Sequence, residues 1–377
     1  MKFPTELIHG PIDHDPSTGA VSVPIYQTST FAQRSFDTPG RYDYTRSGNP
    51  TREALEETIR TLEGGASCAA FSSGMAAICS TLLLFSPGDH LIISDDVYGG
   101  TFRAVTRLFS RWGLKATFVD STDPADVAAA IRPETRGIYV ETPSNPLLRI
   151  TDLDAVVSIA REHRLVTMID NTFMTPYLQQ PIRHGFDIVI HSGTKFLNGH
   201  SDVVCGFAIA RDEETGRRLR FIQNCFGAIL SPHESWLVLR GVRTLKVRME
   251  QSQQSARQIA QWLVGHPRVR AVYYPGLDDH PGREIHLRQA SGAGGVLSFE
   301  LESLETTRRV CEGIGLAAFA VSLGGVESIL SHPATMSHAA MPAEERMRRG
   351  IGDTLLRLSV GLEDPEDLIE ELDRLLG

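Results

Sequence analysis

Short apolar runs alternate with amphipathic segments along the chain from about residue 51 onward. The apolar runs have no polar face, which is typical of strands buried on both sides of a helix-covered sheet. The expected strands are 68–74, 90–96, 115–120, 136–144, 165–170, 186–195 and 203–210. The expected helices, with apolar residues at helical spacing, are 51–64, 75–85, 98–113 (after a turn), 124–134 and 151–164. This alternation predicts an α/β fold with a mostly parallel central sheet covered by helices.

The last third of the chain repeats this pattern on a smaller scale. The segment 233–267 predicts one long helix that connects two parts of the molecule. Strands are expected at 293–302, 319–330 and 355–363, and a helix over 366–377 closes the chain. These elements predict a second, smaller α/β domain, because 377 residues are too many for one ordinary core.

The first 50 residues show little periodicity and contain polar and aromatic runs such as PIYQTSTF and RYDYTRSGNPTR. An irregular arm of this length cannot bury itself, so we expect it to pack on another part of the protein or on a second subunit. The predicted organisation is therefore an arm over 1–50, a larger domain over 51–233 and a C-terminal domain over 234–377 that includes the connecting helix.

Charge and cysteine content narrow the class of protein. The net charge of −9, with no Lys/Arg run, argues against nucleic acid and anionic membranes as partners. The five cysteines are scattered and form no C-x-x-C, which argues against a disulfide framework and against a metal site. The chain has no stretch of about 20 apolar residues and no apolar signal core at its start, so we expect a soluble cytoplasmic protein.

Lysine is scarce, and one lysine has an unusual place in the pattern. Of Lys2, Lys115, Lys195 and Lys246, only Lys195 lies just past the end of a predicted strand near an acidic strand end. That acidic residue is Asp170, which ends the preceding strand. In a doubly wound sheet the carboxyl ends of the strands form the ligand crevice, so both side chains are expected in the same crevice.

An amine and a carboxylate in one crevice match the needs of pyridoxal 5'-phosphate (PLP). The cofactor needs a primary amine for covalent attachment as a Schiff base, and a carboxylate that keeps its pyridine nitrogen protonated. Taken singly, Lys195 reads as a solvated loop residue and Asp170 as part of a turn or helix cap. Their combination with the features below favours the cofactor site.

A strand-to-helix turn offers donors for the cofactor phosphate. Ser73, Gly74 and Met75 lie at this turn, where a helix N-terminus presents free N–H groups and glycine permits close approach. Ser192 and Thr194 add hydroxyl groups beside the lysine. A simple helix cap is the alternative interpretation of the turn, and the sequence contains no Walker loop.

Two further features of the sequence bear on the chemistry of the site. Tyr98 follows another strand end, where an aromatic ring can stack on the pyridine or simply pack in a turn. Residues 192–195 also match S-x-x-K, the nucleophile motif of β-lactamases and penicillin-binding proteins. The partner motifs S-D-N and K-T-G are absent, and the match follows an apolar strand instead of opening a helix, so this class is disfavoured.

A series of motifs follows in order along essentially the whole chain. They are YDYTRSGNPTR, AFSSGMAAI, DVYGGTFR, VETPSNP, DNTF with TPYLQ, DIVIHSGTKFLNGHSD, SLGGVES and RLSVGLED. In these motifs the chain resembles the Cys/Met-metabolism family of PLP enzymes. The resemblance implies the aspartate-aminotransferase-like fold (fold type I).

The resemblance implies roles for the matching residues. Lys195 forms the Schiff base, Asp170 pairs with the pyridinium nitrogen, and Tyr98 stacks on the ring and can shuttle protons. The residues implied to hold the phosphate within the same chain are Gly74, Met75, Ser192 and Thr194.

Other implied roles concern the neighbouring subunit and the substrate. Tyr44 and Arg46 bind the phosphate from the neighbouring subunit, in a homotetramer built from catalytic dimers. Arg357 clamps the α-carboxylate of an amino-acid substrate through its two parallel N–H groups. Ser322 and Asn145 lie where the family contacts carboxylate and cofactor.

Within the family, the run FAVSLGGVESILSHPATMSHAAMP looks most like cystathionine β-lyases. That likeness implies β-elimination of L-cystathionine to homocysteine, pyruvate and ammonia, a step of methionine biosynthesis and transsulfuration. Val321 stands where several γ-acting relatives have Glu, and Gly100 stands where methionine γ-lyases usually have Cys. Cystathionine γ-lyase, γ-synthase and O-acetylhomoserine sulfhydrylase remain alternatives. A non-catalytic PLP-binding protein is disfavoured, because the implied catalytic residues are all present.

Overall fold

The computed structural model describes residues 1–12, 14–339 and 341–377, and contains two β-sheets. The larger sheet has seven strands in the order β1-β7-β6-β5-β4-β2-β3. Five of them, from β6 to β3 in that order, are parallel, whereas β7 runs antiparallel to both its neighbours. The strands are β1 (Ser67–Phe71), β2 (His90–Ser94), β3 (Lys115–Val119), β4 (Thr135–Glu141), β5 (Val166–Asp170), β6 (Ile188–His191) and β7 (Gly206–Ala210). The predicted α/β fold with a mostly parallel sheet is confirmed.

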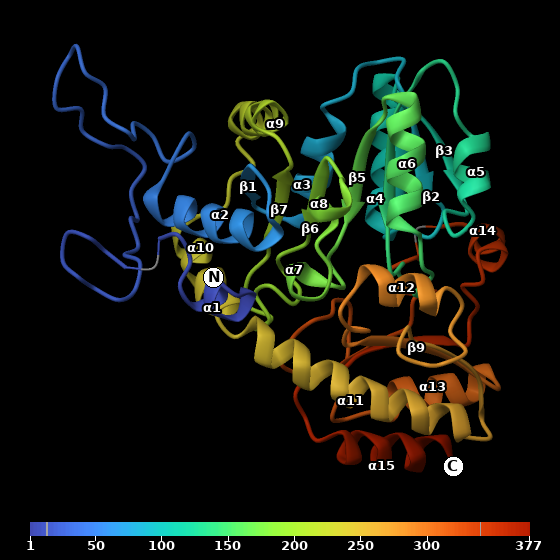
Figure 1. Cartoon of the computed structure of the whole chain (residues 1–377). Helices are drawn as coiled ribbons and strands as arrows, with labels where there is room; N and C mark the ends of the chain where they lie inside the picture. The colour runs from blue at the N-terminus through green and yellow to red at the C-terminus, as the bar shows by residue number, and fades with distance from the viewer. Residues whose placement is uncertain (13, 340) are drawn as a thin grey trace.

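Helices cover both faces of this sheet (Figure 1). One face packs against α3 (Gly74–Leu82), α4 (Gly99–Arg103) and α9 (Glu213–Phe226). The other face packs against a second set of helices, which are α2 (Pro50–Glu63), α6 (Leu153–His163), α7 (Thr175–Leu178), α8 (Pro181–His184) and α10 (Pro232–Val242). At the edge of the sheet lies the short α5 (Pro124–Ala129). The strands are apolar on both faces because both faces are covered.

The smaller sheet has five strands in the order β10-β11-β12-β9-β8. These are β8 (Val269–Tyr273), β9 (Val296–Leu301), β10 (Ala318–Phe319), β11 (Ile329–Ser331) and β12 (Leu355–Ser359). They share a core with α11 (Leu245–Gly265), α13 (Leu304–Gly313) and α15 (Pro365–Leu376). The first turns of α11 instead belong to the core of the larger sheet, so this helix connects the two layers (Figure 1).

The prediction of a single strand over 319–330 is wrong. β10 and β11 are two short parallel strands, and residues 320–328 between them form a loop. Ser322 and Gly324 in this loop have φ angles of 96° and 77°, which a strand does not accommodate. The loop reaches the cavity described below.

The prediction of a single long helix over 233–267 is also wrong. α10 ends at Val242 and α11 begins at Leu245, because Thr244 has φ −101° and ψ 4°. The guanidinium of Arg248 donates to the carbonyl of Gly241, which lies at the end of α10, and to the hydroxyl of Thr244. Side-chain donors thus stabilise the break together with the backbone bond from the Thr244 N–H to the Gly241 carbonyl.

Several polar elements were not expected from the sequence. They are α1 (Phe3–Ile8), α9, α12 (Arg283–Gln289), α13, α14 (Ala343–Arg348) and β8. The helix expected over 98–113 is α4 followed by a π-turn over Ala104–Leu108 and a 3-10 turn over Phe109–Trp112. Among the described residues, no helix is both long and apolar enough to cross a membrane.

The N-terminal segment extends away from the body of the chain in long loops (Figure 1). Its contacts include an isolated bridge between Thr30 and Tyr44, bonds to α2 such as that between Tyr26 N–H and the Thr51 hydroxyl, and a bond from Arg46 to α9. Many of its side chains are exposed, Phe36 fully so. The division into three parts, of which the arm also includes the undescribed residue 13, remains a prediction.

Candidate active site

A cavity of about 470 Å³ lies at the carboxyl ends of the parallel strands, between the two sheets. It contains all the predicted site residues except Tyr44 and Arg46. Parallel strands bring their carboxyl ends to one edge, which explains why residues distant in the sequence meet here. The predicted residues that line it are Ser73, Gly74, Met75, Tyr98, Asn145, Asp170, Ser192, Thr194, Lys195, Ser322 and Arg357.

The amine of Lys195 is held in a defined position. Its Nζ donates a 2.6 Å hydrogen bond to the hydroxyl of Ser322, on the loop between β10 and β11. Burial, with a smaller contribution from the nearby Arg357, lowers the pKa of Lys195 to about 8. A substantial share of this amine is therefore neutral, and nucleophilic, near physiological pH.

Arg357, on β12, is buried with 3% of its surface exposed, and its guanidinium is fixed by two hydrogen bonds. Nη1 donates to Asn145 Oδ1 at 2.7 Å, and Nη2 donates to the Ser322 carbonyl at 2.9 Å. Burial lowers the pKa of Arg357 to about 10, so the group stays charged at neutral pH. An oriented guanidinium that lines a cavity suits a carboxylate.

Two carboxyl groups lie side by side in the cavity, at the ends of β4 and β5. Asp170 pairs in register with Glu141. Asp170 Oδ1 accepts a 3.0 Å bond from the Thr172 N–H, and Glu141 Oε2 accepts a 2.8 Å bond from the Tyr98 N–H. Burial raises the pKa of both carboxyls, and repulsion from Asp170 raises that of Glu141 further. A cation between them would therefore be strongly favoured.

The N-terminus of α3 meets the turn that follows β6. The Ser73 hydroxyl accepts a 3.0 Å bond from the Ala76 N–H, so Ser73 caps the helix as well as lining the cavity. A Cβ on Gly74 would lie 2.8 Å from the Ser192 Cβ, so this close approach requires glycine. The Thr194 hydroxyl is already bonded to the backbone N–H and carbonyl of Cys205. The helix end and the Ser192 hydroxyl therefore form the better anion site.

Tyr98 precedes α4, and its ring lies over the start of that helix. A Cβ on Gly100 would lie 2.3 Å from the Tyr98 Cε1 and 2.8 Å from the Met75 sulfur. A residue with a side chain at position 100 would therefore displace the ring. This gives Gly100 a physical role, whereas the sequence offered only a comparison with other family members.

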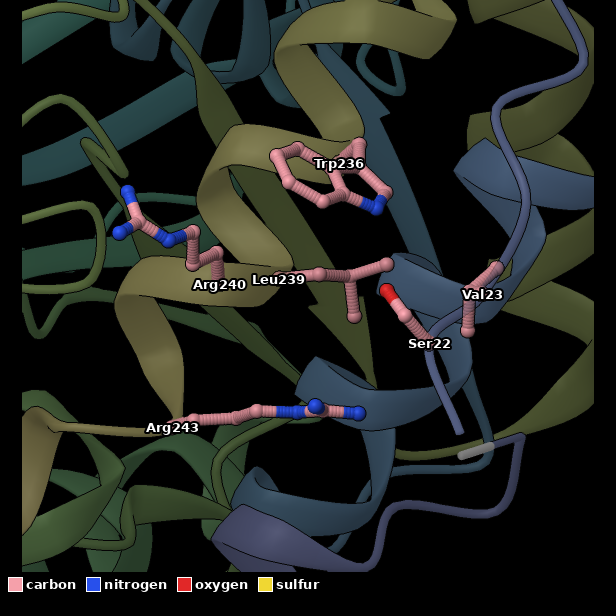
Figure 2. Close-up of a pocket in the computed structure, with 6 residues that line it drawn as sticks. All are labelled: Ser22, Val23, Trp236, Leu239, Arg240 and Arg243. Carbon is pink, nitrogen blue, oxygen red and sulfur yellow. The ribbon is translucent and has the colours of Figure 1, made fainter. Parts of the chain in front are cut away.

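Tyr44 and Arg46 lie outside the cavity. They line a separate hollow with Gly227 and Pro232, where the Arg46 guanidinium donates to the Asn224 carbonyl and lies over the Tyr44 ring. Another hollow, between the N-terminal segment and α10, contains none of the predicted residues (Figure 2). A role for Tyr44 and Arg46 in the cavity around Lys195 thus requires a second copy of the chain.

The sequence reasoning named no site role for several residues that line the cavity, although it compared Gly100 and Val321 with other family members. They are Ile78, Gly100, Arg103, Glu141, Thr172, Phe173, Val204, Val321, Leu323, Met336 and Ser337. Glu141 had a usable signal, because it is the first charged residue after the apolar run of β4, but the strand expected over 136–144 placed it in the interior. Met336 and Ser337 had none, because they approach from a loop of the smaller sheet.

This set of residues fits PLP. A buried amine with one partner, a paired carboxylate and a helix N-terminus approached closely through Gly74 provide for the covalent bond, the ring nitrogen and the phosphate. The oriented guanidinium of Arg357 lies in the same cavity, where an amino-acid carboxylate would bind.

Comparison with known proteins agrees with this geometry. Residues 4–377 match the family model described as Cys/Met metabolism PLP-dependent enzyme. The chain is 58% identical to the cystathionine beta-lyase MetC of Bacillus subtilis, over 99% of this chain and 95% of the relative. It is 50% identical to the cystathionine gamma-lyase of the same organism, over 100% and 99% of the two chains. Cystathionine gamma-lyase from Lactobacillus plantarum, solved with L-serine, has a TM-score of 0.98 at 46% identity and covers 100% of this chain and 98% of its own. The chain belongs to the Cys/Met-metabolism family of PLP-dependent enzymes.

Proposed function

We propose that this protein is a carbon–sulfur lyase that cleaves L-cystathionine by β-elimination, giving homocysteine, pyruvate and ammonia. The observation that carries the proposal is the 58% identity to a cystathionine beta-lyase, which exceeds the 50% identity to a cystathionine gamma-lyase. Val321 supports it, because this apolar side chain is 62% exposed and lines the cavity, where it offers no partner to the distal amino group of the substrate.

The proposed cofactor contacts follow from the geometry. Lys195 attaches PLP covalently, Asp170 pairs with the ring nitrogen, and Tyr98 stacks on the ring. The α3 N-terminus and Ser192 bind the phosphate, with Ser73, Met75 and Thr194 around it. When bound, PLP supplies an electron sink that stabilises negative charge at the substrate Cα.

The chain's own residues then perform binding and proton transfer. Arg357, oriented by Asn145, binds the substrate carboxylate and thereby fixes the Cα. The substrate amine would replace Lys195 on the cofactor, and the freed amine of Lys195 would take the Cα proton as general base, a role that its pKa near 8 suits at neutral pH. Ser322 keeps that amine directed into the cavity. Loss of the Cα proton then allows the Cβ–S bond to break and homocysteine to leave.

The assembly forms part of the proposal. Tyr44 and Arg46 complete the phosphate site of a neighbouring subunit, within a homotetramer of catalytic dimers. The exposed arm and the distance of these residues from the chain's own cavity support this arrangement.

Product identification after mixing the purified protein with L-cystathionine tests the proposal. Pyruvate plus homocysteine is the expected result. The second candidate, γ-elimination, is favoured by the likeness to two gamma-lyases and would give 2-oxobutyrate plus cysteine. No turnover would sink both lyase assignments and direct attention to homoserine esters with a thiol acceptor.

A further inference from the structure

A buried cluster of Glu63, His191 and Asn171 lies at the ends of α2, β6 and β5, outside the cavity. Glu63 ends α2, His191 ends β6, and Asn171 directly follows β5. None of the three has more than 1% of its surface exposed, and none lines the cavity. Asn171 and His191 are nevertheless each adjacent in sequence to a residue that lines the cavity.

The neighbours are Asp170 and Ser192, both predicted cofactor contacts. Consecutive residues of an extended chain point to opposite sides, so the cluster and the two contacts face apart. Any shift of Asn171 or His191 is passed to Asp170 or Ser192 through one peptide unit.

A single carboxylate oxygen connects the two strand ends. Glu63 Oε1 accepts a 3.0 Å hydrogen bond from Asn171 Nδ2 and lies 2.6 Å from His191 Nε2. Asn171 Nδ2 also donates to the Gln179 carbonyl at 2.9 Å. Hydrogen bonds to a buried carboxylate are short and strong. The ends of β5 and β6, already joined by the bond from the Asn171 N–H to the Ile190 carbonyl, are thus also linked by side chains to the end of α2.

The cluster is not explained by packing alone. Within the part of the chain that the structure describes, Glu63 Oε2 and His191 Nδ1 are buried and have no hydrogen-bond partner. Such groups lower stability, and apolar side chains of similar size would avoid the loss. Hydrophobic residues could replace this cluster with a smaller loss of stability. The directional hydrogen bonds to two strand ends therefore give a reason for its polar side chains.

We propose that Glu63 and His191 are positioning residues for the cofactor. Through Glu63 Oε1 they hold Asp170 and the turn from Ser192 to Lys195 at the spacing that bound PLP needs. The inference rests on the cofactor site proposed above. Because neither side chain reaches the cavity, their loss is expected to weaken PLP binding and to leave the substrate KM of the PLP-saturated enzyme unchanged.

The test compares PLP affinity, measured by titrating cofactor-depleted protein with PLP and following its absorbance. Glu63→Leu removes both hydrogen bonds, His191→Leu removes one, and His191→Gln keeps a neutral donor near the Nε2 position. The matched control is Tyr274→Phe, which removes a hydroxyl that shares its proton between the carbonyls of Gly294 and Gln253 in the core of the smaller sheet. Thermal unfolding of each cofactor-free variant is measured in parallel.

We expect Glu63→Leu and His191→Leu to weaken PLP binding at least tenfold, as loss of supporting residues does at metal sites. His191→Gln should stay within about threefold of the wild type. Tyr274→Phe should lower the unfolding temperature without changing PLP affinity. If Glu63→Leu does not fold, the pair of His191 variants decides the question.

Unchanged PLP affinity in the leucine variants, or a loss in Tyr274→Phe equal to theirs, would overturn the inference, because the cluster would then act only on stability. Failure of His191→Gln to rescue binding would also overturn it. These results are distinct from failure of the proposed site, in which the wild-type protein itself would not bind PLP through Lys195.

Discussion

Lys195 and Ser322 join the two sheets across the cavity through a 2.6 Å hydrogen bond from Nζ to Oγ. Lys195 follows β6 of the larger sheet, whereas Ser322 lies between β10 and β11 of the smaller one. Ser322 has a φ of 96°, a conformation that residues with a side chain adopt only at a cost. The Ser322 hydroxyl thus bonds to the Lys195 amine from a backbone conformation that glycine would adopt without this cost.

Replacing Ser322 separates the effect of the hydroxyl from that of the backbone. Ser322→Ala and Ser322→Gly both remove the hydrogen bond, so we expect each to lower kcat/KM about tenfold, or about 1.4 kcal/mol. The glycine variant should be more stable than the alanine variant by about 1 kcal/mol, because it relieves the strain. Steady-state kinetics and thermal unfolding measure the two effects. Wild-type activity in both variants would show that the hydroxyl does not orient the amine.

Arg357 is expected to be sensitive even to a change that keeps its charge. Arg357→Lys retains a cation but loses the planar pair of N–H groups that Asn145 and the Ser322 carbonyl orient. We expect kcat/KM to fall about a hundredfold, roughly 3 kcal/mol, mainly through a higher KM. Arg309→Lys is the control, since Arg309 binds carbonyls near the C-terminus. A fall in kcat alone would instead place Arg357 in the chemical step.

The sequence predicted that Lys195 and Asp170 lie close together because both are found where strands end. Lys195 and Asp170 lie at the ends of apolar runs, and parallel strands bring such ends to the same edge of the sheet. Glu141 satisfies the same rule, but it was read as an interior residue of a longer strand. The rule therefore predicts the site well where strand ends are placed correctly, and fails where they are not.

The remaining differences come from interactions between distant residues. Next to the break at Thr244, the guanidinium of Arg248 donates to the distant carbonyl of Phe196, and the loop around Ser322 is bonded across the cavity to Lys195. Neither is visible in local periodicity. Tyr44 and Arg46 matched family motifs, but one chain does not bring them to its own cavity.

Gly74 should be required for PLP binding. In Gly74→Ala the new methyl group would lie 2.8 Å from the Ser192 Cβ and 2.9 Å from its hydroxyl, so the helix end and the turn must separate. We expect PLP affinity to fall at least tenfold, measured by cofactor titration. Gly265→Ala is the matched control, because a Cβ there meets nothing within 4 Å. Equal affinity in both variants would mean that the phosphate binds elsewhere.

Lys195 should destabilise the cofactor-free protein at neutral pH. Its pKa is lowered from 10.5 to about 8 on folding, so between these values the unfolded chain binds more protons and stability rises with pH. Below pH 8 the penalty is fully present and amounts to about 3 kcal/mol, an upper bound because the amine also bonds to Ser322.

Lys195→Met removes the charge while keeping a flexible chain of similar length. The cofactor-free variant should therefore be more stable than the wild type at pH 7, by as much as about 3 kcal/mol. The difference should shrink as pH rises from about 8 towards 10.5, where the wild-type amine is neutral in both states. Urea unfolding of both proteins at several pH values measures it. A stability difference that does not change over this interval would mean that the amine has an ordinary pKa, and would remove the argument that Lys195 is ready to act as a base at neutral pH.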